Sequence, residues 1–269
     1  MVKKLFKHEF LAWLRIMPIC YSIPLVAAAF NRIIQLFESD SIYYDLIITG
    51  ATALCMVTLL VCIAAPIVFG VTRFYKNLFS GEGYLSFSLP VTTDNHLWAK
   101  VLTAVCFSVL SVLMTMLSLM IVTSGDLFSA IYEAIQYVVG RIPKEAAGHM
   151  AAYCVELTLT SLVTAFETYL MYYTCICIGQ LFRKNRILAA VGVYFGFYVI
   201  SQVSSTAMSV MFMILEGTGR LEWIDRFIVE QPFETVHIIL CGGLVLNAVM
   251  SLVYYLVCRV IIRRKLNLE

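Results

Sequence analysis

The stretch Leu46–Val71 reads LIITGATALCMVTLLVCIAAPIVFGV and contains no charged residue. A helix needs about 20 mostly apolar residues to cross the hydrocarbon core of a bilayer, and this stretch exceeds that length. Lipid offers no hydrogen-bond partner to an exposed backbone, so a helix is the expected form of such a segment. The stretch is therefore predicted to be a transmembrane helix.

Five further stretches share this apolar character. Hydrophobic residues make up 61% of the sequence and charged residues 13%, which is about half the charged fraction of a soluble protein. We predict an all-α membrane protein in which residues 1–269 form a single transmembrane domain with six transmembrane helices. Besides residues 46–71, the predicted helices cover residues 17–37, 97–122, 150–182, 187–215 and 235–262.

Basic residues are distributed unevenly among the segments that join these helices. When the N-terminus is placed in the cytosol, 14 of the 19 lysine and arginine residues fall in cytosolic segments. Such an excess is what the positive-inside rule requires. Both termini are therefore expected in the cytosol. The formal net charge of +2 is too small to indicate nucleic acid as a partner.

The first 16 residues form a separate element in this prediction. Their large apolar residues recur at helical spacing among basic side chains, and Pro18 then offers a place for the chain to turn into the bilayer. This pattern is typical of an amphipathic helix that lies on the membrane surface in contact with lipid. Two shorter stretches, residues 127–142 and 221–229, are predicted as amphipathic helices on the outer face. The apolar residues of the first stripe are Leu5, Phe6, Phe10, Trp13, Leu14 and Met17.

The segment between the second and third helices, residues 73–95, is unusual for a loop that faces the cytosol. It is rich in aromatic and aliphatic residues, and it contains glycines, which permit sharp turns. Apolar side chains on a water-facing loop indicate a surface that a partner covers, or tight packing beneath the bundle. These apolar residues are Phe74, Tyr75, Leu78, Phe79, Tyr84, Leu85, Phe87 and Leu89.

In this loop the sequence resembles a known family. The motif EGYLSFSLPV at residues 82–91, preceded by RFYKNL at residues 73–78 and followed by Lys100, is similar to the six-helix membrane subunits of bacterial ABC exporters. In that family the ATPase is a separate subunit. The resemblance implies that residues 82–90 form a coupling helix that docks into the ATPase, and that two membrane subunits and two ATPase subunits make one transporter in the bacterial cell membrane. The implied contacts are Glu82, Tyr84, Leu85, Phe87, Leu89 and Pro90.

The fourth predicted helix contains two acidic residues, Glu156 and Glu167. Eleven residues make about three helical turns, which places both carboxylates on one face, roughly 16 Å apart along the axis. Thr160 and Thr164 lie on the same face. Carboxylates within a membrane often mark a transport pathway, so these four residues are the pathway candidates. The alternative is that Glu167 is neutral and hydrogen-bonded to a neighbouring helix.

The fifth predicted helix contains Gly192 and Gly196 in a G-x-x-x-G motif. Such glycines let two helix backbones approach closely. One interpretation is packing within a single subunit, and the other is contact with a second membrane subunit. The resemblance implies that the second and fifth helices line a central cavity and contribute to a dimer.

Other functional classes find little support in the sequence. The nucleotide-binding motif G-x-x-x-x-G-K-[ST] and the motifs H-E-x-x-H and G-x-S-x-G do not occur. The four histidines lie on different segments and the nine cysteines lie in apolar runs, so we expect no metal site, no cofactor and no catalytic residue. The main alternative to an exporter subunit is a proton-coupled secondary transporter that uses Glu167, although no internal repeat supports it.

Overall fold

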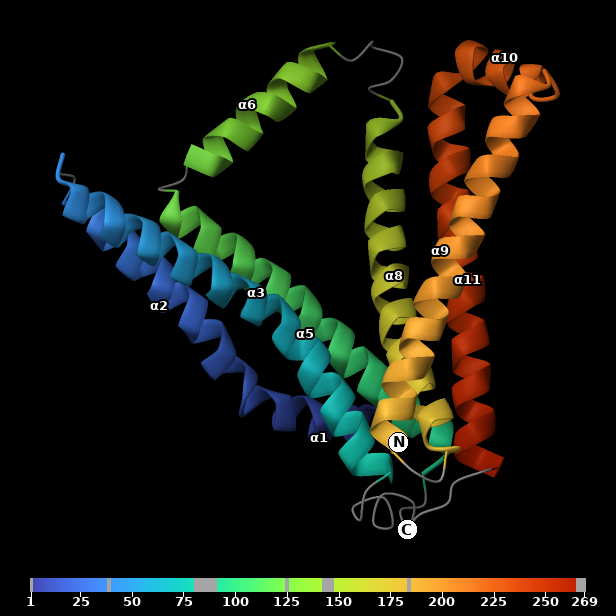
Figure 1. The fold of residues 1–269 in the computed structure, drawn as a ribbon, viewed down its shortest axis with the longest axis horizontal. Coiled ribbons are helices and arrows are strands. Elements are labelled where there is room, and N and C mark those ends of the chain that lie inside the picture. Colours follow the sequence, from blue (N-terminus) through green and yellow to red (C-terminus); the bar gives the residue numbers. More distant parts are fainter. Residues whose placement is uncertain are drawn as a thin grey trace. The chain divides into compact units, whose positions relative to one another are not determined.

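The computed structural model describes residues 2–37, 40–79, 91–123, 126–141, 148–182 and 185–264. Every secondary-structure element within these ranges is an α-helix (Figure 1). Six of the helical segments are long and apolar enough to cross a membrane. The prediction of an all-α protein with six membrane-length helices is thereby confirmed.

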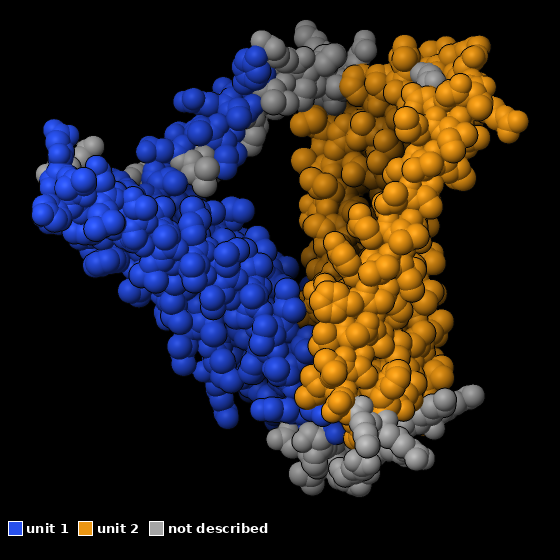
Figure 2. Space-filling view, viewed as in Figure 1, with its two compact units in different colours: residues 1–142 blue, residues 143–269 orange. Residues whose placement is uncertain are grey.

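The chain divides into two compact units, residues 1–142 and residues 143–269 (Figure 2). The first unit contains α1 (Val2–Leu14), α2 (Met17–Gln35), α3 (Ile42–Phe79), α5 (Thr93–Val122) and α6 (Asp126–Arg141). The second unit contains α8 (Met150–Gly179), α9 (Arg186–Gly217), α10 (Glu222–Glu230) and α11 (Pro232–Arg264). The short helices α6 and α10 confirm the helices predicted at residues 127–142 and 221–229.

In the first unit, α2, α3 and α5 pack against one another along their length. Small residues permit this close packing, and Ala28, Cys55 and Leu59 form a buried cluster between the helices. Hydrogen bonds also cross between them, since the Tyr21 hydroxyl donates to the Phe107 carbonyl at 2.9 Å. Such bonds remove polar groups from contact with lipid, where an unpaired group is costly.

The N-terminal helix α1 ends at Leu14 and is separated by a turn from α2, which begins at Met17. Within its predicted apolar stripe, Trp13 and Met17 are buried inside the protein, whereas Leu14 is exposed. The Trp13 ring stacks on Phe107 of α5, with ring centroids 5.1 Å apart. Helix α1 therefore packs against α5, and an amphipathic helix on the membrane surface stays a prediction.

The loop after α3 is shorter than the predicted segment of residues 73–95. Helix α3 continues through Phe79, and α5 begins at Thr93. The predicted helix ends at Val71 because hydropathy marks only the part of a helix that lies in lipid. The helix itself continues for two further turns. Residues 80–90, which include the predicted coupling residues Glu82, Tyr84, Leu85, Phe87, Leu89 and Pro90, lie outside the described residues.

In the second unit, α8 packs against both α9 and α11. The contacts between α8 and α11 run in step along the two helices, from Tyr153 with Phe233 to Cys177 with Cys258. Residue numbers rise together on both sides, so the two helices are parallel. We refer to this α8–α11 contact as the parallel seam.

Candidate functional site

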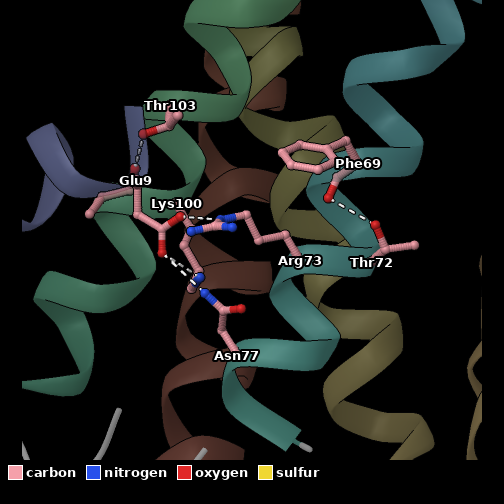
Figure 3. A network of polar contacts seen from close by, with 8 residues as sticks. Glu9, Phe69, Thr72, Arg73, Asn77, Lys100 and Thr103 are labelled. Atoms are coloured by element: carbon pink, nitrogen blue, oxygen red, sulfur yellow. Dashed lines mark hydrogen bonds and ion pairs between the residues drawn. The ribbon is translucent and has the colours of Figure 1, made fainter. Parts of the chain in front are cut away.

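A buried carboxylate binds three helices of the first unit together (Figure 3). Glu9 of α1 accepts a hydrogen bond from Arg73 Nε of α3 at 2.6 Å and one from Lys100 Nζ of α5 at 2.8 Å. The Asn77 amide of α3 donates to the same carboxylate at 3.4 Å. We call these four residues, Glu9, Arg73, Asn77 and Lys100, the ion cluster.

The local helical geometry brings these residues together. Arg73 and Asn77 are four residues apart near the end of α3, which places them on one face. Lys100 lies in the second turn of α5, and Glu9 lies on the face of α1 that packs against α5. The ion cluster therefore lies where α3 ends and α5 begins, on the two helices that flank residues 80–90 in the sequence.

The ion cluster is largely shielded from solvent. The side chain of Lys100 is 5% exposed and that of Glu9 is 12% exposed, whereas Arg73 retains 28%. Nearby, the aromatic rings of Phe10, Trp13 and Phe107 pack together on the same α1–α5 contact. Charges removed from water are stable only with good geometry and several partners, and Glu9 meets this condition with two cations and an amide.

The second unit has its polar contacts along the parallel seam. Near the start of α8 and α11, His237 Nδ1 lies 2.8 Å from a carboxylate oxygen of Glu156. Further along, Asn247 donates to Thr164 Oγ1 at 2.8 Å, and Thr174 Oγ1 donates to the Tyr254 carbonyl at 3.0 Å. The thiols of Cys177 and Cys258 lie 3.1 Å apart at the other end.

The four pathway candidates differ in their surroundings. Glu156 and Thr164 are hydrogen-bonded to α11, as described above, and the Thr160 hydroxyl is buried without a hydrogen bond among the described residues. Glu167 lies on α8 near Tyr254, is partly exposed, and makes no hydrogen bond within the described ranges. A pathway role for these residues stays a prediction, and Glu167 is the member that the parallel seam leaves without a hydrogen bond.

The glycines of α9 do not pack closely within the described part of this subunit. A Cβ atom added at Gly192 or Gly196 would meet no atom within 4 Å. The close approach of α8 and α9 occurs instead at Gly179, where a Cβ atom would lie 2.7 Å from the Ala190 Cβ. The structure therefore offers no packing partner to Gly192 and Gly196 among the described residues, and a contact with a second subunit stays a prediction.

Sequence reasoning missed Glu9, Gly179 and the pairing of two histidines. His149 Nδ1 and His237 Nε2 lie 2.9 Å apart, although the two residues belong to different helices. One signal for Glu9 was present, because it is the only acid among the basic residues of the first 16 positions. A single acid in a basic amphipathic helix is a reason to look for a buried partner.

Within the described residues, no group of three or more histidine, cysteine, aspartate or glutamate side chains converges to hold a metal ion. The carboxylate of Glu156 and the ring of His149 lie on opposite nitrogens of His237, which explains why these three do not surround one point. No protein-family model, curated protein or solved structure matches the chain. Two arrangements of side chains carry the functional inference, the ion cluster and the parallel seam.

Proposed function

We propose that the chain is the membrane-spanning subunit of an ATP-driven ABC exporter, in which it forms half of the translocation pathway and couples to a separate ATPase subunit. A second membrane subunit, identical or related, completes the pathway in a bacterial cell membrane, with the termini in the cytosol. Six membrane-length helices support a transport role. The sequence lacks the common nucleotide-binding loop, so the energy must come from another subunit or from an ion gradient.

The position of the ion cluster is the observation that carries this proposal. The cluster connects α1 to the end of α3 and the start of α5 through Glu9, Arg73 and Lys100. A force applied to the segment between α3 and α5 would therefore move three helices together instead of bending one. Rigid-body movement of packed elements is how such transporters switch between two states.

Helix α9 supports the second part of the proposal, a partner subunit beside this one. Every residue from Tyr198 to Ile214 is exposed. At 100° per residue, Ser205 lies on the face opposite Gly196, and Ser201 and Ser209 lie within 40° of Ser205. One face therefore carries the two glycines and aliphatic residues and the other is hydroxyl-lined, as expected of a helix between a neighbouring helix and a wet cavity.

The test is to replace Tyr84 and Leu85 with alanine and to purify the membrane subunit with its ATPase. These side chains are the proposed anchors, and loss of an interface anchor typically costs 2 kcal/mol or more, about 30-fold in affinity. The variant should fold normally but lose most of its bound ATPase. Its matched control is alanine at Ile131 and Tyr132, an exposed aliphatic–aromatic pair on α6, which should retain the ATPase.

The same purified protein, reconstituted in vesicles, separates the proposal from proton-coupled transport through Glu167. Glu167 favours this second candidate because it is a partly exposed carboxylate without a hydrogen bond in the described part of α8 and its neighbours. An ABC exporter should move substrate only with ATPase and ATP. Transport driven by a pH gradient alone, and abolished by Glu167→Gln, would instead establish the second candidate. Normal transport and ATPase retention in the Tyr84 and Leu85 variant would overturn the coupling proposal.

A further inference from the structure

Three ionisable side chains form a hydrogen-bonded chain at the start of the parallel seam. The Glu156 carboxylate lies 2.8 and 3.0 Å from His237 Nδ1, and His237 Nε2 lies 2.9 Å from His149 Nδ1. Glu156 and His149 belong to the beginning of α8, and His237 belongs to the second turn of α11. The side chains of His237 and Glu156 are 18% and 20% exposed, so the protein does not enclose them fully.

The number of protons on Glu156, His237 and His149 decides which hydrogen bonds exist between them. With both imidazoles neutral, His237 Nδ1–H donates to Glu156, so His237 Nε2 must accept from His149 Nδ1–H. When His237 carries a second proton, it donates at both nitrogens, and a neutral His149 accepts at Nδ1. One added proton therefore keeps both hydrogen bonds. A second added proton makes both facing nitrogens donors, and the bond between the histidines is lost.

The two imidazoles have different surroundings. The Glu156 carboxylate contacts its ring, and the Tyr153 ring lies 4.4 Å from it, a distance suited to cation–π attraction. His149 lies at the N-cap of α8, where the positive end of the helix dipole disfavours a second cation. The two protonation sites are therefore not equivalent, and in the doubly protonated site both facing nitrogens carry a proton.

Among the described residues, other charged groups lie near the starts of α8 and α11 without forming a hydrogen bond to the two histidines. The charge of Glu234 acts on Tyr153, and it adds to the negative potential that favours a proton. The helix packed against α11, α10, contributes Glu222, Arg226 and Glu230, and α9 carries Glu216 near its end. Within the described part of the chain, none of these four forms a hydrogen bond or ion pair with either imidazole.

We propose that Glu156, His237 and His149 form a proton-binding site that accepts one proton without structural change and separates the starts of α8 and α11 when it accepts a second. The contacts further along the parallel seam consist of an amide, hydroxyls, carbonyls and buried thiols. The amide, the hydroxyls and the carbonyls do not titrate near neutral pH, so these contacts stay in place. At the start of the seam the Tyr153 hydroxyl also donates to the Phe233 carbonyl at 2.9 Å. A single neutral hydrogen bond in a membrane protein is weak, so the repulsion between two facing imidazolium charges opposes it directly, and the separation is confined to the first turns. This inference does not depend on the proposed function.

Histidine-selective ¹⁵N NMR of the full chain tests the proton count. The chain has four histidines, and single substitutions assign their signals. His149 and His237 should take up their protons in two separate steps, as expected for strongly interacting sites. Glu156→Gln should weaken the first step by about ten-fold in proton affinity, the low end of a carboxylate's effect on a neighbouring cation.

The exposed His8 of α1 serves as the internal control, because its titration should be the same in wild type and in Glu156→Gln. Simultaneous titration of His149 and His237 in one step, unaffected by Glu156→Gln, would overturn the proposed site. If Glu156→Gln folds poorly, His149→Phe provides the second variant. It keeps a ring beside Phe233, whose ring lies 5.8 Å from that of His149, and it should leave a single step at His237.

A distance measurement tests the predicted separation. Spin labels at Ala151 and Val236, both exposed near the starts of α8 and α11, should move apart after the second protonation step in wild type. Labels at Leu181 and Val260, near the other ends of the same helices, should keep their distance. His149→Phe should make both distances independent of pH. A pH-independent distance between Ala151 and Val236 in wild type would contradict the proposal.

Discussion

The ion cluster of the first unit and the parallel seam of the second hold helices together by different means. In the ion cluster, one carboxylate contacts two basic side chains, Arg73 and Lys100. The parallel seam consists of hydrogen bonds between neutral groups and of two contacts, Glu156 with His237 and His149 with His237, whose charge varies with protonation. The first arrangement resists change, and the second can open in part.

The energetic reason for this difference is the cost of leaving a charge buried. Two cations and one carboxylate removed from water stabilise a structure only as a set, and loss of one member is severe. A neutral hydrogen bond inside a membrane protein contributes about 0.6 kcal/mol on average, because the groups find other partners when it breaks. The ion cluster suits a part that transmits force, and the parallel seam suits a part that moves.

The largest effect should follow the removal of Glu9. Glu9→Ala leaves Lys100, whose side chain is 5% exposed, without the carboxylate that it contacts. Removal of one partner of a buried ion pair costs about 3–5 kcal/mol. Thermal unfolding of the purified chain in detergent should therefore show a strong loss of stability.

A matched control is available for this substitution. Glu222 and Arg226 on α10 also form an ion pair, at 3.4 Å, but their side chains are 68% and 73% exposed. Glu222→Ala should leave the unfolding temperature unchanged within error, since exposed pairs contribute little. Equal effects of Glu9→Ala and Glu222→Ala would show that the ion cluster is not a strong joint.

A smaller effect is expected at Gly179. Because a Cβ atom there would lie 2.7 Å from the Ala190 Cβ and 2.8 Å from its backbone nitrogen, Gly179→Ala must push α8 and α9 apart. Such overpacking typically costs about 1–3 kcal/mol. Gly192→Ala is the control, because its added methyl group meets nothing within 4 Å, and the stability of the single subunit should not fall.

A second variant tests the contact between position 179 and the backbone of Ala190. Replacing Ala190 with glycine removes its methyl group but leaves its nitrogen and Cα in place, so it should not rescue Gly179→Ala. A full rescue would mean that the two helices can shift, which would weaken the description of α8–α9 as a close crossing. A loss of stability in Gly192→Ala would show that α9 already has a packing partner at this position.

The sequence predicts the membrane-spanning helices well because lipid acts on each segment separately. A run such as Leu46–Val71 contains its own evidence, and no distant residue is needed to interpret it. The end of α3 at Phe79 is different, because that helix continues beyond the apolar run with Arg73 and Asn77 on one face. Hydropathy has no means to detect such an extension.

The candidate sites depend on contacts between distant parts of the chain. Glu9 meets residues 64 and 91 positions away, and His149 meets a residue 88 positions away. The sequence shows that these side chains are polar and lie in an apolar setting, so partners are expected. It does not show which partners, because this requires the helix pairing and the rotation of each helix about its axis.

The smallest effect is expected along the parallel seam, at Asn247 and Thr164. The Asn247 amide donates to Thr164 Oγ1 at 2.8 Å, while that hydroxyl donates to the carbonyl of Thr160 at 2.8 Å. Thr164 therefore keeps one hydrogen bond when Asn247 is changed to leucine. In a double-mutant cycle with Thr164→Val, the coupling free energy should be about 0.6 kcal/mol, measured by unfolding in detergent. A coupling above about 2 kcal/mol would place this contact close to the ion cluster in strength. The parallel seam would then resist separation as strongly as the ion cluster does. Weak hydrogen bonds along the seam could then no longer explain why α8 and α11 separate at their first turns.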